Sequence, residues 1–167
     1  MNPQSPDLFE LLDSTHREVL LHLKKLQEVV QALEAGDLDP GQRKKAQEML
    51  AFFNGEARQH HLDEEKQVFP ALLKGEDAAL ADTARHLVQD HGWLEENWLE
   101  IEPSIDAAIH GNQWFDPNEL RQAQEVFEAL YLDHMRLEES IAYPAAQARL
   151  QTGDKAGDKA GTGAPDR

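Results

Sequence analysis

Three proline residues that directly follow a helix-capping residue divide the sequence into helical segments. The pairs are Ser5-Pro6, Asp39-Pro40 and Asp116-Pro117, and each fits an N-cap followed by the first helical position. Glycines that can adopt the left-handed conformation of a helix end stand at positions 36, 75, 111 and 153. This punctuation predicts four helices, at residues 6–35, 40–74, 78–110 and 117–151.

The short connections between these helices make neighbouring helices antiparallel. The predicted fold is therefore all-α, an up-down-up-down antiparallel four-helix bundle formed by residues 1–151. A length of 167 residues suits one domain better than two. Pro70, Pro103 and Pro144 fall late in their helices and are expected to kink or end them. Residues 152–167, with a repeated Gly-Asp-Lys-Ala, have nothing to bury and are predicted to form a disordered tail.

Composition excludes several classes of function. The chain has 16 basic and 32 acidic residues, and its formal charge of -16 disfavours nucleic acid and anionic membrane surfaces as partners. It contains no cysteine, which excludes disulfides, thiolate metal sites, iron–sulfur clusters and thiol catalysis. The N-terminus lacks the regions of a signal peptide, and no apolar run approaches the ~20 residues of a membrane span. We expect a cytoplasmic protein.

Two segments of the chain share the pattern H-x-x-x-E-E-x-x-x-aromatic-P, one beginning at His60 and the other at His134. Residues four apart on a helix lie on nearly the same face. His60 is therefore expected beside Glu64, and His134 beside Glu138. An imidazole next to a carboxylate is a plausible half of a metal site, so the repeat suggests a dinuclear centre between helices.

Two further histidines lie on the apolar stripes of the first and third predicted helices. Apolar residues there recur at alternating spacings of four and three, and His16 and His91 are in register with them. In an antiparallel hairpin, two residues are level when their numbers average to the middle of the turn, and His16 with His60 and His91 with His134 meet this condition. His22 lies off the stripe and ~9 Å from this level, so we expect it at the surface or its boundary.

These observations select six candidate metal ligands: His16, His60, Glu64, His91, His134 and Glu138. Buried carboxylates and imidazoles are unfavourable without partners, and bound metal ions would compensate them. Nitrogen and oxygen ligands without sulfur suit iron, manganese or zinc. Six side chains do not saturate two six-coordinate ions, even if both carboxylates bridge. Positions would stay open for water, dioxygen, peroxide or nitric oxide.

Residues beside the candidate ligands receive weaker predictions. His61, Glu65 and Glu139 are expected to face outward. Asp90 and Asp133 each precede a candidate ligand, but adjacent residues on a helix point about 100° apart, so a solvated role is favoured. Tyr131 is left open between a hydrogen bond near the site and simple packing. Trp98 is expected in the core rather than in a redox relay.

On these motifs the sequence resembles the hemerythrin-like (HHE) cation-binding domains, four-helix bundles with a non-haem di-iron centre. The resemblance covers about residues 8 to 150, and its most specific parts are His60-x-x-x-Glu64 with Phe69-Pro70 and His134-x-x-x-Glu138 with Tyr143-Pro144. It implies that the six candidates bind two iron ions, with Glu64 and Glu138 as bridging carboxylates. The chain looks more like the bacterial branch with four histidines and two glutamates than the oxygen carriers, which use five histidines and an aspartate in place of Glu138.

We therefore predict a di-iron protein that binds or responds to a diatomic ligand or oxidant, such as oxygen, nitric oxide or peroxide. Alternatives stay open, including iron storage or delivery and a purely structural bundle. A third alternative is an oxidoreductase, which would need an external electron-donor protein because no flavin or nicotinamide site is evident. Whether the protein is an enzyme is not decided by the sequence.

Overall fold

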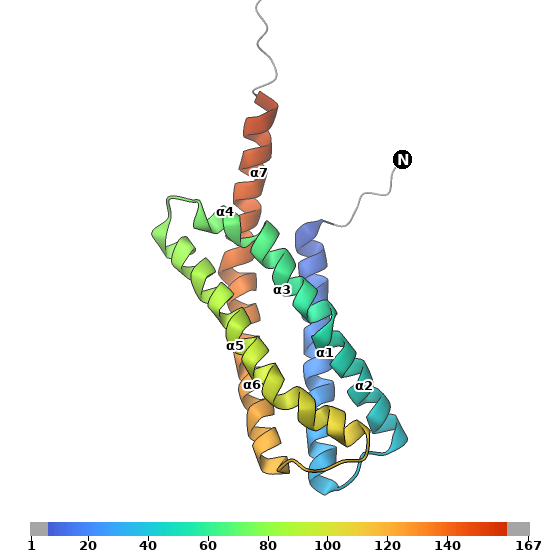
Figure 1. Ribbon diagram of the computed structural model, residues 1–167. Coiled ribbons are helices and arrows are strands. Elements are labelled where there is room, and N and C mark those ends of the chain that lie inside the picture. Colours follow the sequence, from blue (N-terminus) through green and yellow to red (C-terminus); the bar gives the residue numbers. More distant parts are fainter. Residues whose placement is uncertain (1–6, 160–167) are drawn as a thin grey trace, which may run out of the picture.

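The computed structural model describes residues 7–159, with side chains described through residue 152, and every regular element in that part of the chain is helical. The elements are α1 (Leu8–Ala35), α2 (Pro40–Asn54), α3 (Glu56–Gln67), α4 (Phe69–Leu73), α5 (Ala78–Ile109), α6 (Pro117–Leu137), the π-helix η1 (Glu138–Ala142) and α7 (Tyr143–Lys159). They build four antiparallel legs: α1, then α2 to α4, then α5, then α6 to α7 (Figure 1). α1 and α5 each pack against both α2 and α6, which confirms the predicted all-α bundle.

Side-chain caps hold the two predicted helix starts that the Asp-Pro pairs mark. Asp39 forms a capping box with Gln42, because its Oδ1 accepts from the Gln42 amide at 2.8 Å and its own amide donates to the Gln42 side chain at 2.9 Å. Asp116 Oδ1 accepts from the Asn118 amide at 2.9 Å. The helix starts at positions 40 and 117 are thus confirmed, whereas the Ser5-Pro6 pair lies outside the described residues.

The second leg is not the single helix predicted for 40–74. It is interrupted at Gly55, which adopts φ -114 and ψ -89, and again at Val68. Glycine weakens a helix interior, and Pro70 both lacks an amide hydrogen and disfavours helical geometry in the residue before it. These properties explain why α4 restarts at Phe69 with Pro70 in its first turn.

The fourth leg contains a π-helical turn that the sequence analysis did not predict. The Tyr143 amide donates to the carbonyl of Glu138, five residues earlier. Pro144 follows directly and has no amide hydrogen for an α-helical bond, so the widened turn allows the helix to continue through it. Pro103 also fails to end its helix, since α5 runs on to Ile109.

α7 extends past the predicted helix end at 151, as far as Lys159, and projects beyond the bundle (Figure 1). Arg149 anchors it to the second leg by donating to the Ala71 carbonyl at 3.2 Å. The Arg149 guanidinium also lies where a side chain on Gly75 would stand, so a larger residue there would displace the end of the Arg149 side chain. Of the predicted disordered tail, residues 160–167 lie outside the described part of the chain.

The apolar core consists of two separate clusters, one on each side of a buried polar layer. One cluster includes Val19, Leu94 and Phe127, and the other includes Leu12 and Leu87. Each histidine of the polar layer lies between members of the two clusters on its own leg, as His16 does between Leu12 and Val19. The bundle therefore closes the layer with hydrophobic contacts on both sides.

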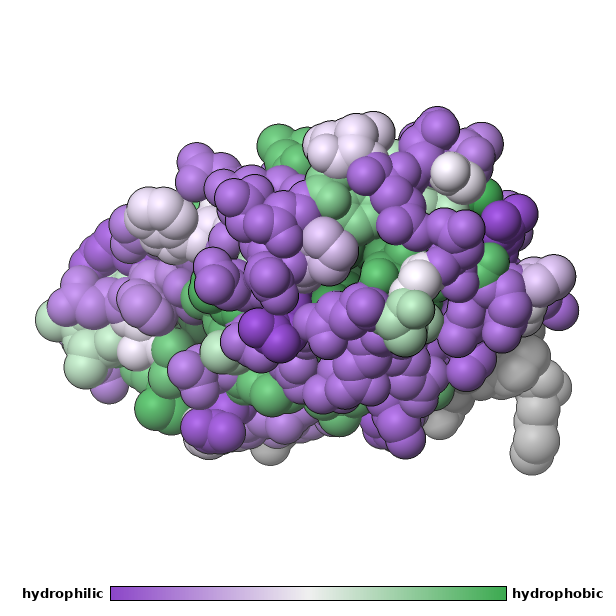
Figure 2. Space-filling model, turned by 90° about the horizontal axis from the view of Figure 1, so that it is seen from below, coloured by the Kyte–Doolittle hydropathy of each residue, from purple (hydrophilic) through white to green (hydrophobic). Residues whose placement is uncertain are grey.

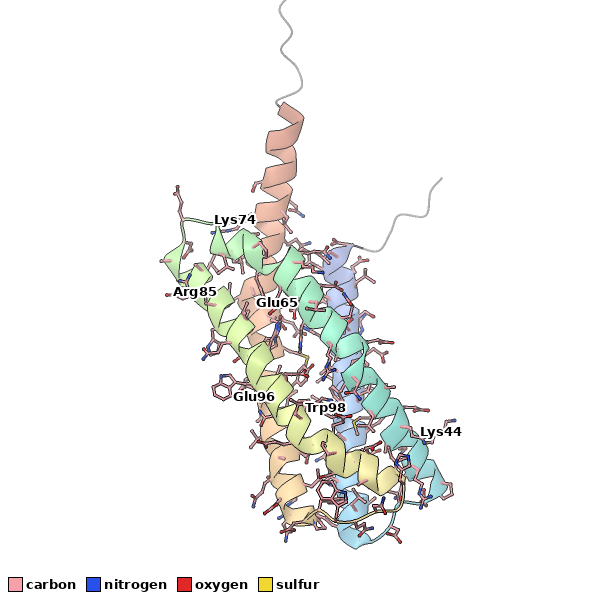
Figure 3. All side chains as sticks on the ribbon, viewed as in Figure 1. Lys44, Glu65, Lys74, Arg85, Glu96 and Trp98 are labelled. Carbon is pink, nitrogen blue, oxygen red and sulfur yellow. The ribbon has the colours of Figure 1, made fainter. Side chains whose placement is uncertain are left out.

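Trp98 points into the bundle from α5 (Figure 3) and is 2% exposed, which confirms its predicted place in the core. Its ring nitrogen donates to Asn54 Oδ1 at 2.8 Å. The face of the molecule in Figure 2 is mostly hydrophilic, in keeping with the charge of -16. Among the described residues, no helix combines the length and the apolarity needed to traverse a lipid bilayer.

Candidate metal centre

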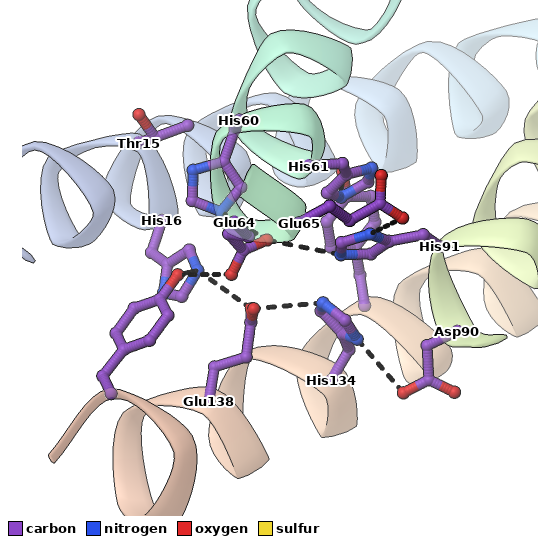
Figure 4. Close-up of polar contacts among 12 residues, drawn as sticks. Thr15, His16, His60, His61, Glu64, Glu65, Asp90, His91, His134 and Glu138 are labelled. Atoms are coloured by element: carbon purple, nitrogen blue, oxygen red, sulfur yellow. Dashed lines mark hydrogen bonds and ion pairs between the residues drawn. The ribbon is translucent and has the colours of Figure 1, made fainter. Parts of the chain in front are cut away.

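The structure brings all six predicted ligands together in the buried polar layer (Figure 4). They come from every leg of the bundle: His16 from α1, His60 and Glu64 from α3, His91 from α5, His134 from α6 and Glu138 from η1. Each of them is at most 7% exposed, and both glutamates are fully buried. The structure thus places these residues at one level along the bundle and on the inward helix faces, as the sequence predicted.

The four imidazoles form two pairs. The ring centroids of His16 and His60 are 4.9 Å apart, and those of His91 and His134 are also 4.9 Å apart. Glu64 can offer an oxygen to a group at either pair, because its ligand atoms lie within 4.8 Å of those of His16 and His60 and of those of His91 and His134. The geometry is that of two adjacent positions sharing a carboxylate.

Each glutamate contacts one imidazole of each pair. Glu64 Oε1 lies 3.3 Å from Nε2 of His60 and 3.3 Å from Nε2 of His91. Glu138 Oε1 lies 3.2 Å from Nε2 of His16 and 3.2 Å from Nε2 of His134. Both carboxylates therefore span the two pairs, which is the placement a bridging ligand requires.

Three of the four imidazoles have their other nitrogen held by a carboxylate. Nδ1 of His134 lies 3.1 Å from Asp90, Nδ1 of His16 lies 3.0 Å from Glu139, and Nδ1 of His91 lies 3.4 Å from Glu65. A carboxylate only accepts, so each Nδ1 carries the hydrogen, and in a neutral ring Nε2 then presents its lone pair to the layer. His60 differs, because its buried Nδ1 has no partner among the described residues.

These contacts give a role to residues that the sequence analysis placed in solvent. Glu65 and Glu139, the second glutamates of the two repeats, face outward as expected, with side chains 37% and 53% exposed, and each also holds a histidine supplied by another leg. Asp90 was expected to be solvated and is instead 6% exposed. It points away from its neighbour His91 on the same helix, yet it reaches His134 across the bundle. Asp133 is exposed, as predicted.

A nitrogen lone pair and a carboxylate oxygen that face each other repel unless a cation lies between them. Burial lowers the pKa of His60 from 6.5 to about 4, and burial also lowers the pKa of His134, so protons do not readily fill this place. Burial favours the neutral acid at Glu64 as well, but the contacts with His91 and His60 outweigh it and lower the pKa of Glu64. Glu64 is therefore an anion beside the neutral imidazoles of His60 and His134.

Several buried ligand atoms lack any hydrogen-bond partner among the described residues. They are Glu64 Oε1, His91 Nε2, His134 Nε2 and both oxygens of Glu138. Two ligands of one ion at right angles and about 2.1 Å from it are ~3.0 Å apart, close to the separations of 3.2 and 3.3 Å found between the imidazole nitrogens and glutamate oxygens. The six residues therefore fit a pair of metal ions in both chemistry and spacing.

Tyr143 is a member of the layer that sequence reasoning missed. Its hydroxyl donates to Glu64 Oε2 at 2.7 Å and lies 3.0 Å from His16 Nε2, and its ring stacks on His16. Burial and then the charge of Glu64 raise the pKa of Tyr143, which keeps the phenol neutral. Because η1 widens the helix turn, Tyr143 follows Glu138 by five residues and still faces the layer. The corresponding residue of the first repeat, Phe69, packs against His91 without a hydroxyl.

His61 was also expected to face outward and does not. Its ring stacks on His91 with the centroids 4.0 Å apart, and its Nε2 lies 3.3 Å from the hydroxyl of Tyr131. This contact settles the open question about Tyr131, which hydrogen-bonds beside the site. A ligand atom of His61 lies within 4.8 Å of ligand atoms of Glu64, His91 and His134.

The prediction for His22 was wrong. It is 8% exposed and stacks on Phe52, with the ring centroids 4.2 Å apart. Its side of α1, off the apolar stripe, faces α2, which packs against α1 there. His22 takes no part in the metal layer, so the level argument separated it correctly from the ligands although its burial was misjudged.

Comparison with known proteins identifies the family of the chain. The model of the hemerythrin HHE cation-binding domain matches residues 7–146, so the chain belongs to this family of cation-binding helical bundles. No curated protein and no solved structure matches it.

Proposed function

We propose that this member of the hemerythrin family binds two iron ions in the buried layer and that the loaded centre binds or responds to oxygen, nitric oxide or peroxide. The proposed ligands are His16, His60, Glu64, His91, His134 and Glu138. One observation carries the proposal: Oε1 of each glutamate lies between the Nε2 atoms of two imidazoles, at 3.2 to 3.3 Å. Manganese and zinc suit the same ligand types.

Iron bound there would supply open coordination positions and a change of oxidation state. The residues of the chain prepare the place for it. Glu64 and Glu138 would neutralise two of the four positive charges of a diferrous pair. Asp90, Glu65 and Glu139 fix the hydrogen on Nδ1 and leave Nε2 free to bind, an arrangement that orients imidazoles and raises their basicity.

The surroundings favour retention of the ions over their ready exchange. Apolar clusters lie above and below the layer along the bundle, and the six candidate ligands are buried between them. The hydroxyl of Tyr143 fixes the orientation of Glu64 from one side. This enclosure supports a ligand-binding or redox role more than iron storage or delivery. An electron-donor protein and a cytoplasmic location stay predictions.

Metal analysis tests the proposal directly. The full chain purified with iron should contain about two iron ions, and His60→Ala should lower this content and change the visible spectrum. His110→Ala is the matched control, because His110 lies at the exposed end of α5, and it should leave both unchanged. Fewer than one metal ion per chain, with no difference between wild type and His60→Ala, would contradict the proposal.

Kinetics then separates the remaining roles. Stopped-flow mixing of the reduced protein with nitric oxide or peroxide should give one stoichiometric event per centre if the protein binds or senses its ligand. Continued consumption in the presence of a chemical reductant would instead identify an oxidoreductase. Rapid loss of iron to a chelator at neutral pH would favour storage or delivery.

A further inference from the structure

A polar cavity of about 500 Å³ lies between α1 and α3, and the candidate ligand His60 lines it. α1 contributes apolar and hydroxyl side chains to its wall, and α3 contributes mainly polar and acidic ones. Most of the lining residues are exposed, so the cavity is open to solvent. It brings small polar species from solvent to one of the six ligands of the layer.

The α3 wall of this cavity is acidic. Glu56, His60 and Asp63 stand at positions i, i+4 and i+7 of α3, which lie along one helix face, and all three line the cavity. None of the described residues that line it is a lysine or an arginine. Acidic walls raise the local concentration of cations. Carboxylates and an imidazole are also ligands that suit divalent iron, manganese and zinc.

The nitrogen of His60 on the cavity side has no partner. Nε2 faces the layer, whereas Nδ1 is buried and without a hydrogen bond among the described residues. Thr15 stands beside His60 (Figure 4) and lines the cavity, but its Oγ1 donates to the Leu11 carbonyl at 3.1 Å. The other three imidazoles of the layer each have a carboxylate at Nδ1. His60, which is 5% exposed, is thus the member of the layer whose outer nitrogen is free.

The contacts of His60 favour a lone pair on this outer nitrogen in the metal-free chain. Its Nε2 lies 3.3 Å from Glu64 Oε1, and a carboxylate only accepts, so this contact favours a hydrogen on Nε2. A neutral ring with its hydrogen on Nε2 carries a lone pair on Nδ1. His60 can therefore bind a cation from the cavity side. The other three imidazoles cannot, because their Nδ1 atoms direct a hydrogen at a carboxylate.

A second cavity, of about 380 Å³, lies beside His16 and is less suited to cations. Asp13, His16 and Glu139 line it and are close enough together to hold an ion. Nδ1 of His16 is nevertheless engaged by Glu139 at 3.0 Å. Arg17 lines the same cavity and repels cations. The cavity beside His60 has neither obstacle.

We propose that divalent metal ions reach the centre through the cavity beside His60 and dock first on Glu56, Asp63 and Nδ1 of His60. This inference rests on the proposed function, because it assumes that the layer binds such ions. It adds a docking site outside the layer and the side of entry. Transfer into the layer exchanges the roles of the two ring nitrogens: Nε2 gives its proton to solvent and binds the ion, and Nδ1 takes a proton from solvent in the cavity.

Uptake of Zn²⁺ by the metal-free full chain, followed by stopped flow with a fluorescent zinc indicator, tests the route. Glu56→Gln and Asp63→Asn each remove one charge from the cavity wall and keep the shape of the side chain. Each should lower the uptake rate severalfold, because attraction of the ion weakens, while the end point, set by the six ligands, stays the same. Asp13→Asn, at the other cavity, and Glu125→Gln, on the exposed face of α6, are matched controls that should keep the wild-type rate.

Nitrogen NMR of the histidine rings tests the docking nitrogen. In the metal-free chain, Nδ1 of His60 should have the chemical shift of a ring nitrogen without hydrogen, and in the chain loaded with Zn²⁺ that of a ring nitrogen with hydrogen. His134, whose Nδ1 contacts Asp90, is the internal control and should carry its hydrogen on Nδ1 in both states. A hydrogen on Nδ1 of His60 in the metal-free chain would overturn the docking role of this nitrogen.

The uptake experiment distinguishes failure of this inference from failure of the proposed function. A chain that binds no metal ion would refute the proposed function, and with it the route. A chain that binds two ions, and takes them up at the wild-type rate in both Glu56→Gln and Asp63→Asn, would overturn the route alone. Slower uptake in Asp13→Asn than in Glu56→Gln would place entry beside His16, and equal slowing in Glu125→Gln would assign the effect to the overall charge. Either result would overturn the inference.

Discussion

Replacing Glu138 with glutamine should stabilise the metal-free protein and weaken its response to metal. Both oxygens of Glu138 are buried without a hydrogen-bond partner, and Oε1 lies 3.2 Å from Nε2 of both His16 and His134. A glutamine side chain of the same shape can donate both amide hydrogens to these two nitrogens. It converts two repulsive contacts into hydrogen bonds.

The size of this effect follows from the burial of the group. An unsatisfied buried polar group destabilises a fold by about 1–3 kcal/mol. Relief of this penalty at Glu138 should raise the free energy of unfolding by about 2 kcal/mol, which for a chain of this size raises Tm by roughly 4–8 °C. Wild-type protein should in contrast gain about 4 kcal/mol from metal present at ~1,000 times Kd, and the variant should gain much less, because it lacks one anionic bridging ligand.

Thermal unfolding with and without metal, followed by circular dichroism, measures both effects. Glu125→Gln is the matched control, since Glu125 is exposed on α6, and its two melting temperatures should equal those of wild type. The reasoning would be refuted if Glu138→Gln lowered Tm of the metal-free protein while keeping the full shift on metal addition. That outcome would mean that Glu138 is a structural partner of the histidines and not a ligand held ready for a cation.

Three further predictions follow from single contacts. Asp90→Ala removes the acceptor that orients His134 and should weaken metal binding by about 10–100-fold in a competition titration, whereas Asp133→Ala, at an exposed position, should not. His22→Leu removes a buried nitrogen without a described partner while keeping an apolar contact with Phe52, so it should raise the free energy of unfolding by about 1 kcal/mol without changing the metal content. The folded-state pKa of His60 is about 4 against 6.5 unfolded, so the unfolded chain binds the extra proton between these values. The free energy of unfolding of the metal-free protein should therefore fall by about 3 kcal/mol from this group as the pH falls from 6.5 to 4. Denaturant titrations of wild type and His60→Ala measure this loss. The same pH dependence in both proteins would contradict the burial argument.

The candidate ligands could be predicted from sequence because two independent geometric conditions apply to them. A helix fixes which residues share a face, and a short antiparallel turn fixes which residues share a level. His16 and His91 carry no local motif, yet both conditions select them. His22 fails the level condition, and it is indeed absent from the layer.

The partners of these ligands could not be predicted in the same way, because they belong to other legs of the bundle. Asp90 and His91 point about 100° apart on α5, which is why a contact between them was rejected. Asp90 instead accepts a hydrogen bond from His134 on another leg. The repeated Glu-Glu pair did contain a usable signal, since Glu65 and Glu139 recur at equivalent places. The position of Tyr143 depends on the π-helical turn, and a residue period of 3.6 does not anticipate such a turn.

The two repeats are related by an approximate twofold symmetry, and its imperfections distinguish the two metal positions. The operation that exchanges His60, Glu64 and Glu65 with His134, Glu138 and Glu139 also exchanges His16 with His91. Under it Phe69 takes the place of Tyr143, and Thr15 takes the place of Asp90, which leaves His60 without the partner that His134 has. Two ions in this centre would not be interchangeable. A single ion would bind preferentially at one of the two positions, and an electron added to the pair would have a preferred site.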